Sequence, residues 1–161
     1  CVLFMEARMK NISKLLLTSF ICLGVTASLT GCNSTSQTNE KGPSKILFTD
    51  DYGNGNLTFD LDIYSIDIEA GTTLEKVFNA SDIKLSKNGS KSVSVENKLN
   101  AYSCYQIVIT PKNGSGVVYR SGSASYDFHY KNVFLASPGQ NIKMKLEDFY
   151  NNSYYFKLSQ I

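Results

Sequence analysis

From residue 45 onwards, apolar and polar side chains alternate along most of the chain. Two clear runs have apolar residues at Leu57, Phe59, Leu61, Ile63 and at Ile142, Met144, Leu146. A period of two is typical of β-strands that bury one face, because successive side chains point to opposite sides of a sheet. Similar runs recur at intervals of about 8–12 residues with turn residues between them. The sequence therefore predicts an all-β domain over residues 45–161, an antiparallel β-sandwich or small barrel of about eight strands.

Two segments depart from this alternation. The apolar parity changes between Ile63 and Ile66, which predicts a β-bulge or bend near Tyr64–Ser65. Residues 71–80 instead place apolar side chains at i, i+3 and i+4, which predicts one short helix that covers one end of the sheets. The apolar stripe of this helix would be Leu74, Val77 and Phe78.

Several connections carry turn residues. A three-residue loop at 88–90 is predicted to form a hairpin that pairs Leu85 with Val93 and so buries one clean face. The segment Pro111–Gly116 is predicted to join residues 101–110 to 117–119 as another pair, and Pro138-Gly139 suits a type II turn. Further strands are predicted at Tyr126–Tyr130, Val133–Ala136 and Tyr154–Leu158.

The first 32 residues have a different pattern. Lys10 and Lys14 precede about 13 mostly apolar residues, and small residues follow up to Cys32. A positive head, a short apolar core and a small-residue cleavage site make a secretory signal. A permanent membrane helix needs about 20 apolar residues, so this run is too short to span a bilayer. The chain is therefore predicted to be exported.

The residues Leu29-Thr30-Gly31-Cys32 resemble the lipobox of bacterial lipoprotein precursors, in which a leucine lies three places before the modified cysteine. The resemblance covers about residues 9–32. It implies cleavage between Gly31 and Cys32, a diacylglyceryl group on the Cys32 sulfur, and an acyl chain such as palmitate on the new amine. Two or more acyl chains hold a protein stably on a membrane. An ordinary signal peptide that has a cysteine near its cleavage site is the alternative.

These features divide the chain into four predicted segments. Residues 1–8 are interpreted as an extension upstream of the true start, 9–31 as the signal peptide, and 32–44 as the lipidated cysteine with a flexible tether. Residues 33–44 contain no large apolar side chain, so they cannot repay the entropy of ordering. Fully extended, the tether would reach about 40 Å from the membrane to the β-domain at 45–161.

Charge and composition exclude several function classes. From residue 32 onwards the chain has 13 Lys+Arg and 13 Asp+Glu, and no basic run. A neutral domain gives nucleic acid no electrostatic footprint, so no nucleic-acid partner is predicted. The predicted partners are membrane lipid, through acylated Cys32, and another envelope protein.

The residues that could carry catalysis or bind metal are sparse. His129 is the only histidine, and Cys104 is the one cysteine beyond Cys32. After cleavage and lipidation at Cys32, Cys104 would be the one cysteine left, so no internal disulfide is predicted. Cys104 is interpreted as a small buried hydrophobic side chain in a strand, with a reactive thiol or an intermolecular bridge as the alternative, and a Cys104–His129 dyad is not favoured. The acidic loop 50–56 fails the calcium-loop pattern, since Tyr52 stands where an oxygen ligand is needed, and is interpreted as a hairpin turn. No catalytic residue, metal site or cofactor is predicted.

Tyrosines are concentrated in the second half of the chain, for example at Tyr102, Tyr105, Tyr119 and Tyr154. They are interpreted chiefly as strand residues, with a sugar-stacking or protein-binding surface as the alternative. The leading hypothesis is a non-enzymatic envelope lipoprotein, a structural or protein-interaction component such as those of secretion assemblies. The alternative is a glycan- or small-molecule-binding module. Because Asn33 rather than aspartate follows Cys32, the lipoprotein pattern implies the outer membrane in a Gram-negative cell.

Overall fold

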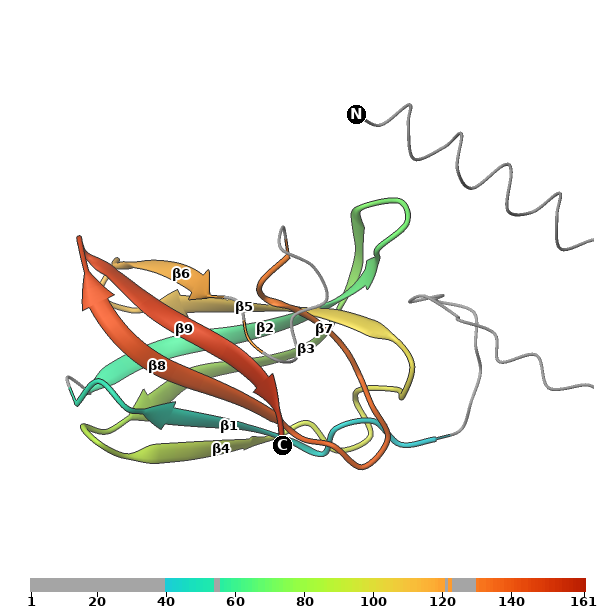
Figure 1. Cartoon of the computed structure of the whole chain (residues 1–161), viewed down its shortest axis with the longest axis horizontal. Helices are drawn as coiled ribbons and strands as arrows, with labels where there is room; N and C mark the ends of the chain where they lie inside the picture. Colours follow the sequence, from blue (N-terminus) through green and yellow to red (C-terminus); the bar gives the residue numbers. More distant parts are fainter. Residues whose placement is uncertain (1–39, 54–55, 121, 123–129) are drawn as a thin grey trace, which may run out of the picture.

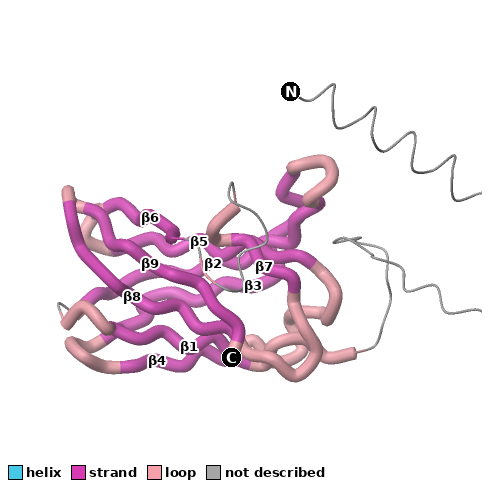
Figure 2. The backbone as a smooth tube through the Cα atoms, viewed as in Figure 1, coloured by secondary structure: helices cyan, strands magenta, loops and turns pink. Residues whose placement is uncertain are grey.

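The computed structural model describes residues 40–53, 56–120, 122 and 130–161. These residues form nine β-strands and no helix (Figures 1 and 2). The strands are β1 (Lys45–Asp50), β2 (Leu57–Asp67), β3 (Thr72–Leu85), β4 (Ser90–Ser94), β5 (Cys104–Pro111), β6 (Gly116–Arg120), β7 (Val133–Leu135), β8 (Ile142–Tyr150) and β9 (Ser153–Gln160). The predicted all-β sandwich is confirmed, and the two sheets are separate rather than closed into a barrel.

The first sheet has the order β4-β1-β8-β9-β6 and the second the order β3-β2-β5-β7 (Figure 1). Most neighbouring strands run antiparallel, as predicted. Two pairs are parallel, namely β1 with β8 and β6 with β9. Both parallel pairs join strands that are far apart in the sequence, so hairpin patterns could not have indicated them.

The main core lies between the sheets and is built from the inward-facing residues of the alternating runs. The aromatic ring of Phe59 on β2 lies 4.8 Å from that of Phe48 on β1 and 6.5 Å from that of Phe156 on β9, between ring centroids. All three side chains are fully buried. Burying a side chain of this size contributes about 2–3 kcal/mol, so these rings join the two sheets strongly.

The short helix predicted for residues 71–80 is wrong. Residues 72–80 belong to β3, a 14-residue strand at the edge of the second sheet. The register between β2 and β3 shifts three times, and each shift places one extra residue in β3. Extra residues break the period of two and distribute apolar side chains over both faces. The spacing of Leu74, Val77 and Phe78 therefore imitates a helix.

The change of apolar parity after Ile63 reflects a second packing surface. The register does shift at Tyr64, where a bulge was predicted, but the extra residue lies in β3 and β2 continues unbroken to Asp67. Apolar residues beyond this point therefore lie on the opposite face of the sheet. There Ile66 packs in a small separate cluster with buried residues of β5 and β7.

Both predicted hairpins are wrong in their pairing. Strands β3 and β4 lie in different sheets, and Val93 pairs with Ile46 of β1 rather than with Leu85. Strands β5 and β6 also lie in different sheets. The predicted buried face is nevertheless correct, because Leu85 and Val93 enter the same core. Each connection crosses from one sheet to the other instead of closing a hairpin.

The turn at Pro138-Gly139 has the expected features of type II. Gly139 has a φ of 71°, and the N–H of Gln140 donates to the carbonyl of Ser137 over 3.3 Å. The strand predicted at Tyr126–Tyr130 lies almost entirely outside the described residues, and Tyr130 itself is not in a strand.

The sandwich has two ends, which we call the tether end and the far end. At the tether end, residues 40–44 lie against the β4–β5 connection: the N–H of Gly42 donates to the carbonyl of Leu99 over 3.1 Å. The β2–β3 hairpin projects beyond the sheets at this end (Figure 1). The far end has the β1–β2, β3–β4, β5–β6 and β8–β9 connections (Figure 1).

Candidate functional site

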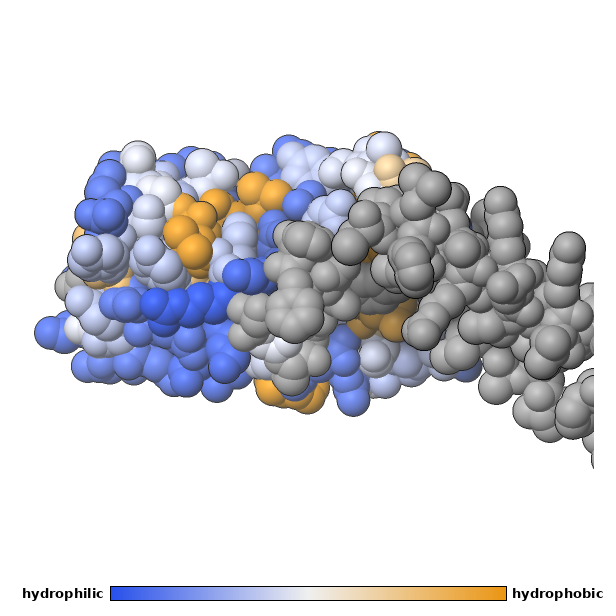
Figure 3. Space-filling view, turned by 45° about the horizontal axis from the view of Figure 1, so that its top comes forward, coloured by the Kyte–Doolittle hydropathy of each residue, from blue (hydrophilic) through white to orange (hydrophobic). Residues whose placement is uncertain are grey.

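The residues predicted to carry the anchor, Gly31 and Cys32, lie outside the described residues. In the part of the chain that is described, no helix is long and apolar enough to cross a membrane. The face of the molecule in Figure 3 is mainly hydrophilic with small apolar patches, as expected for a sandwich whose apolar residues are used in its core.

The acidic loop at the far end is a structural turn. The carboxylate of Asp50 is almost fully buried, with Oδ1 accepting the N–H of Gly53 over 2.9 Å and Oδ2 accepting the N–H of Asn88 over 2.8 Å. Asp50 therefore joins the β1–β2 loop to the β3–β4 loop. Its neighbour Asp51 forms an ion pair of 3.1 Å with Lys145 on β8. Among the described residues, no group of three or more His, Cys, Asp or Glu side chains is arranged to hold a metal ion.

Cys104 is buried at the start of β5, as predicted, and its sulfur is in a disulfide bond. It is therefore not available as a nucleophile in this structure. The sequence leads us to expect no internal disulfide in a chain cleaved before Cys32, whereas the structure is of the whole chain, which has three other cysteines. His129, the other member of the dyad considered above, lies outside the described residues.

Several tyrosines support the sandwich from within, as their interpretation as strand residues implies. The hydroxyl of Tyr119 accepts the N–H of Ile109 over 2.8 Å, which links β6 to β5 across the two sheets. Burial raises the pKa of Tyr119 to about 12. The hydroxyl of Tyr154 accepts the side-chain amide of Asn113 over 2.9 Å. Other tyrosines lie at the surface, and Tyr150 at the β8–β9 turn is 65% exposed.

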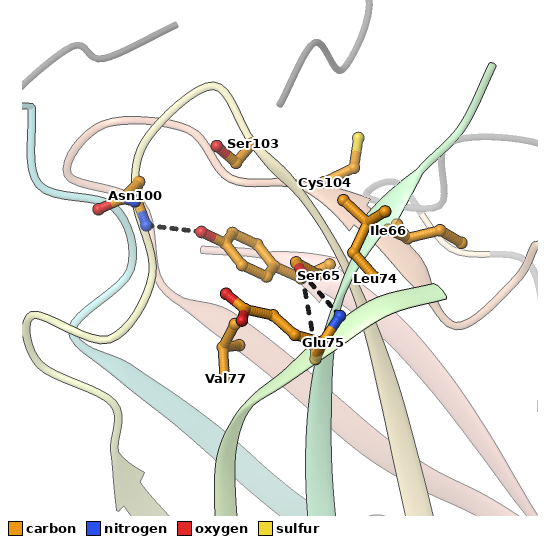
Figure 4. A pocket seen from close by; sticks show the side chains of 9 residues that line it. Ser65, Ile66, Leu74, Glu75, Val77, Asn100, Ser103 and Cys104 are labelled. Atoms are coloured by element: carbon orange, nitrogen blue, oxygen red, sulfur yellow. Dashed lines mark hydrogen bonds between the residues drawn. The ribbon is translucent and has the colours of Figure 1, made fainter. Parts of the chain in front are cut away.

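A pocket of about 340 Å³ opens at the tether end, between the β2–β3 hairpin and the beginning of β5 (Figure 4). Nine residues line it: Ser65, Ile66, Leu74, Glu75, Val77, Asn100, Ser103, Cys104 and Tyr105. A volume of this size is at the small end of the range for ligand pockets, about 300–1,000 Å³. The pocket has room for a side chain or a small molecule.

The walls of the pocket are held in place by hydrogen bonds. The hydroxyl of Tyr105 accepts the N–H of Asn100 over 2.8 Å, which fixes the ring against the β4–β5 connection. On the hairpin, the N–H of Glu75 donates to the hydroxyl oxygen of Ser65 over 3.2 Å. Burial raises the pKa of Tyr105, so its phenol stays neutral. The pocket therefore combines a neutral aromatic ring, a carboxylate and short polar side chains.

Of the pocket residues, only Cys104 and Tyr105 were considered from the sequence, Tyr105 as one of the tyrosines of an alternative binding surface. Leu74 and Val77 were assigned to the apolar stripe of a helix, and Glu75 lies within the same predicted helix. Only the pairing of β3 with β2, and of β2 with β5, brings these residues to the same end of the sheet as Tyr105. Comparison with protein-family models, curated proteins and solved structures finds no match for the chain.

Proposed function

We propose that the chain is a membrane-anchored envelope lipoprotein whose β-sandwich is a non-catalytic structural or protein-interaction component, for example of a secretion or envelope assembly. The observation that carries this proposal is the sequence Leu29-Thr30-Gly31-Cys32 after a short apolar run. A lipidated Cys32 would anchor the protein and would concentrate it close to partners in the same envelope.

The position of the tether end supports this arrangement. Residue 40 is the first described residue, and the N–H of Ala101 donates to its carbonyl over 3.2 Å. Seven residues separate it from Cys32, and an extended segment of that length reaches about 25 Å. The tether end would therefore face the membrane at short range, and the far-end loops would face away from it.

The chemistry of the described residues supports a non-catalytic role. Asp50 is occupied by two backbone N–H groups, and the buried hydroxyl of Tyr119 accepts a third. Arg120 forms partly exposed ion pairs with Glu147 and Asp148 on the outside of a sheet. Such pairs are typical of a solvated sheet face.

The anchor is tested by Cys32→Ala in cells that express the full chain. We expect an uncleaved precursor that takes up no labelled fatty acid, while the parent chain is cleaved, labelled and recovered with membranes. Cys104→Ala is the matched control, because it removes another cysteine and should leave cleavage and labelling intact. If Cys32→Ala is still cleaved and labelled normally, the lipid-anchor proposal fails.

The choice between inner and outer membrane is a separate part of the proposal. In a Gram-negative cell, Asn33 after Cys32 implies sorting to the outer membrane. Asn33→Asp should shift the lipidated protein towards the inner membrane on density-gradient separation, and Ser34→Asp, one residue further, is the matched control. Recovery of the unsubstituted lipidated protein in the inner membrane would contradict this part alone.

A further inference from the structure

The pocket at the tether end has the charge pattern of a cation-binding site. Glu75 supplies a carboxylate, and the lining contains no lysine, arginine or histidine. Among the described residues, Glu75 forms no ion pair. The adjacent Lys76 is engaged elsewhere, since its Nζ lies 3.0 Å from Asp62 and 5.4 Å from the centre of the Tyr64 ring. The carboxylate in the pocket is therefore not neutralised from within the described chain.

The other walls suit an organic cation rather than a metal ion. Figure 4 shows the Glu75 side chain in this hollow, which Tyr105 also lines. A carboxylate attracts ammonium and guanidinium groups and accepts a charge-assisted hydrogen bond from them, and Tyr105, which is 3% exposed, adds a neutral aromatic wall. Ile66, Leu74 and Val77 offer apolar contacts to the methylene groups of such a side chain. A divalent metal would instead need several oxygen ligands converging on one point.

We propose that this pocket binds an alkylammonium or guanidinium group, presented as a lysine or arginine side chain by a partner protein. The proposal rests on the interaction role proposed above and names the chemistry of the partner. Leu74 is 51% exposed and lies at the rim, where it provides apolar surface for the segment that carries the cation. The partner would be recognised through this one side chain and not by adding a strand to the sheet, because the three bulges of β3 oppose continuous strand pairing at this edge.

The test uses the full-length protein in detergent and N-acetyl-lysine N-methylamide as the probe, titrated by two-dimensional amide NMR. Saturable shifts are expected at Ser103 and Tyr105, and N-acetyl-norleucine N-methylamide, which lacks the charge, should bind more weakly. Glu75→Gln should reduce the affinity about fivefold, as for a partly exposed ion pair. Glu69→Gln, on the same hairpin but outside the pocket lining, is the matched control and should have no effect.

The outcomes separate the possible sources of the cation. If n-butylammonium binds as tightly as the lysine derivative, the site takes free amines and the partner-protein assignment is overturned. If the uncharged analogue binds equally well, if Glu69→Gln weakens binding as much as Glu75→Gln, or if no saturable shift occurs, the cation site itself is overturned. None of these results depends on lipid at Cys32, so a failure here is distinguishable from a failure of the anchor.

Discussion

Replacing Asp50 by alanine should destabilise the sandwich more than replacing any other acidic side chain of the far-end loops. Asp50 is 4% exposed, and the two oxygens of its carboxylate accept one N–H from each of two loops, over 2.9 and 2.8 Å. A hydrogen bond to a charged group is worth about 1.5–3 kcal/mol, and a buried N–H left without a partner incurs a similar penalty. Because water can replace part of these two hydrogen bonds at the end of the sandwich, we expect Asp50→Ala to lower the free energy of unfolding by about 3 kcal/mol.

The assay is urea unfolding followed by circular dichroism, together with a thermal melt. At about 4 °C per kcal/mol for a domain of this size, Asp50→Ala should lower the Tm by about 12 °C. Asp50→Asn keeps one acceptor oxygen and should cost roughly half as much. Chelation of divalent cations should leave the Tm of the parent protein unchanged, since backbone N–H groups already occupy both carboxylate oxygens.

Asp51→Ala is the matched control because Asp51 is the next residue and its partner is a partly exposed lysine. Its ion pair with Lys145 should be worth at most about 1 kcal/mol. If Asp50→Ala costs no more than Asp51→Ala, the reasoning from burial and backbone hydrogen bonds is refuted.

Three further predictions test other parts of the fold. Phe156→Ala removes a fully buried ring between the sheets and should cost about 3–5 kcal/mol by urea unfolding, whereas Tyr150→Ala at an exposed turn should cost about 0.5 kcal/mol or less. Between pH 10 and 12, the free energy of unfolding measured in urea should fall less for Tyr119→Phe than for the parent protein. The unfolded chain releases this proton near its ordinary pKa of 10.0 while the folded chain retains it up to about 12, so stability falls as the pH rises through this window. Gly139→Ala should cost about 1 kcal/mol in the same unfolding assay through φ alone, because an added Cβ would meet no atom within 4 Å; a null effect there would contradict the type II turn.

The alternation of side chains was sufficient to predict the class of fold and most of the buried face. Ile142, Met144 and Leu146 are all fully buried, and so are Phe59 and Leu61. These positions follow from local pattern, because one face of each strand must be apolar if the sheets are to pack. Residues such as Leu85 and Val93 also enter the core as predicted.

The pairing of strands could not be predicted in the same way. A period of two says which side of a strand is buried but not which strand lies beside it. The parallel pairs β1–β8 and β6–β9 depend on contacts between distant segments, and the crossing connections after β3 and β5 resemble hairpins in their turn residues. The bulges of β3 gave its apolar residues the spacing of a helix. A helix was therefore predicted there, because the sequence shows only local spacing and not the pairing with β2.

The pocket was beyond prediction from the sequence for a related reason. Its lining comes from β2, β3, β5 and the β4–β5 connection, and only the sheet order brings Glu75 and Tyr105 to one pocket. A single glutamate in an apolar stripe gave no signal of its own. The anchor, in contrast, is a local motif, so the sequence alone can propose it.

The most direct test of the central proposal is the mass of the N-terminal peptide of the protein isolated from its own cells. We expect a peptide that begins at Cys32 and carries a diacylglyceryl group on the sulfur. A thioether and a disulfide cannot share one sulfur atom. An unmodified Cys32 within an uncleaved chain, or a peptide in which Cys32 is disulfide-bonded to Cys104, would contradict the proposal that this sandwich is held to a membrane by lipid.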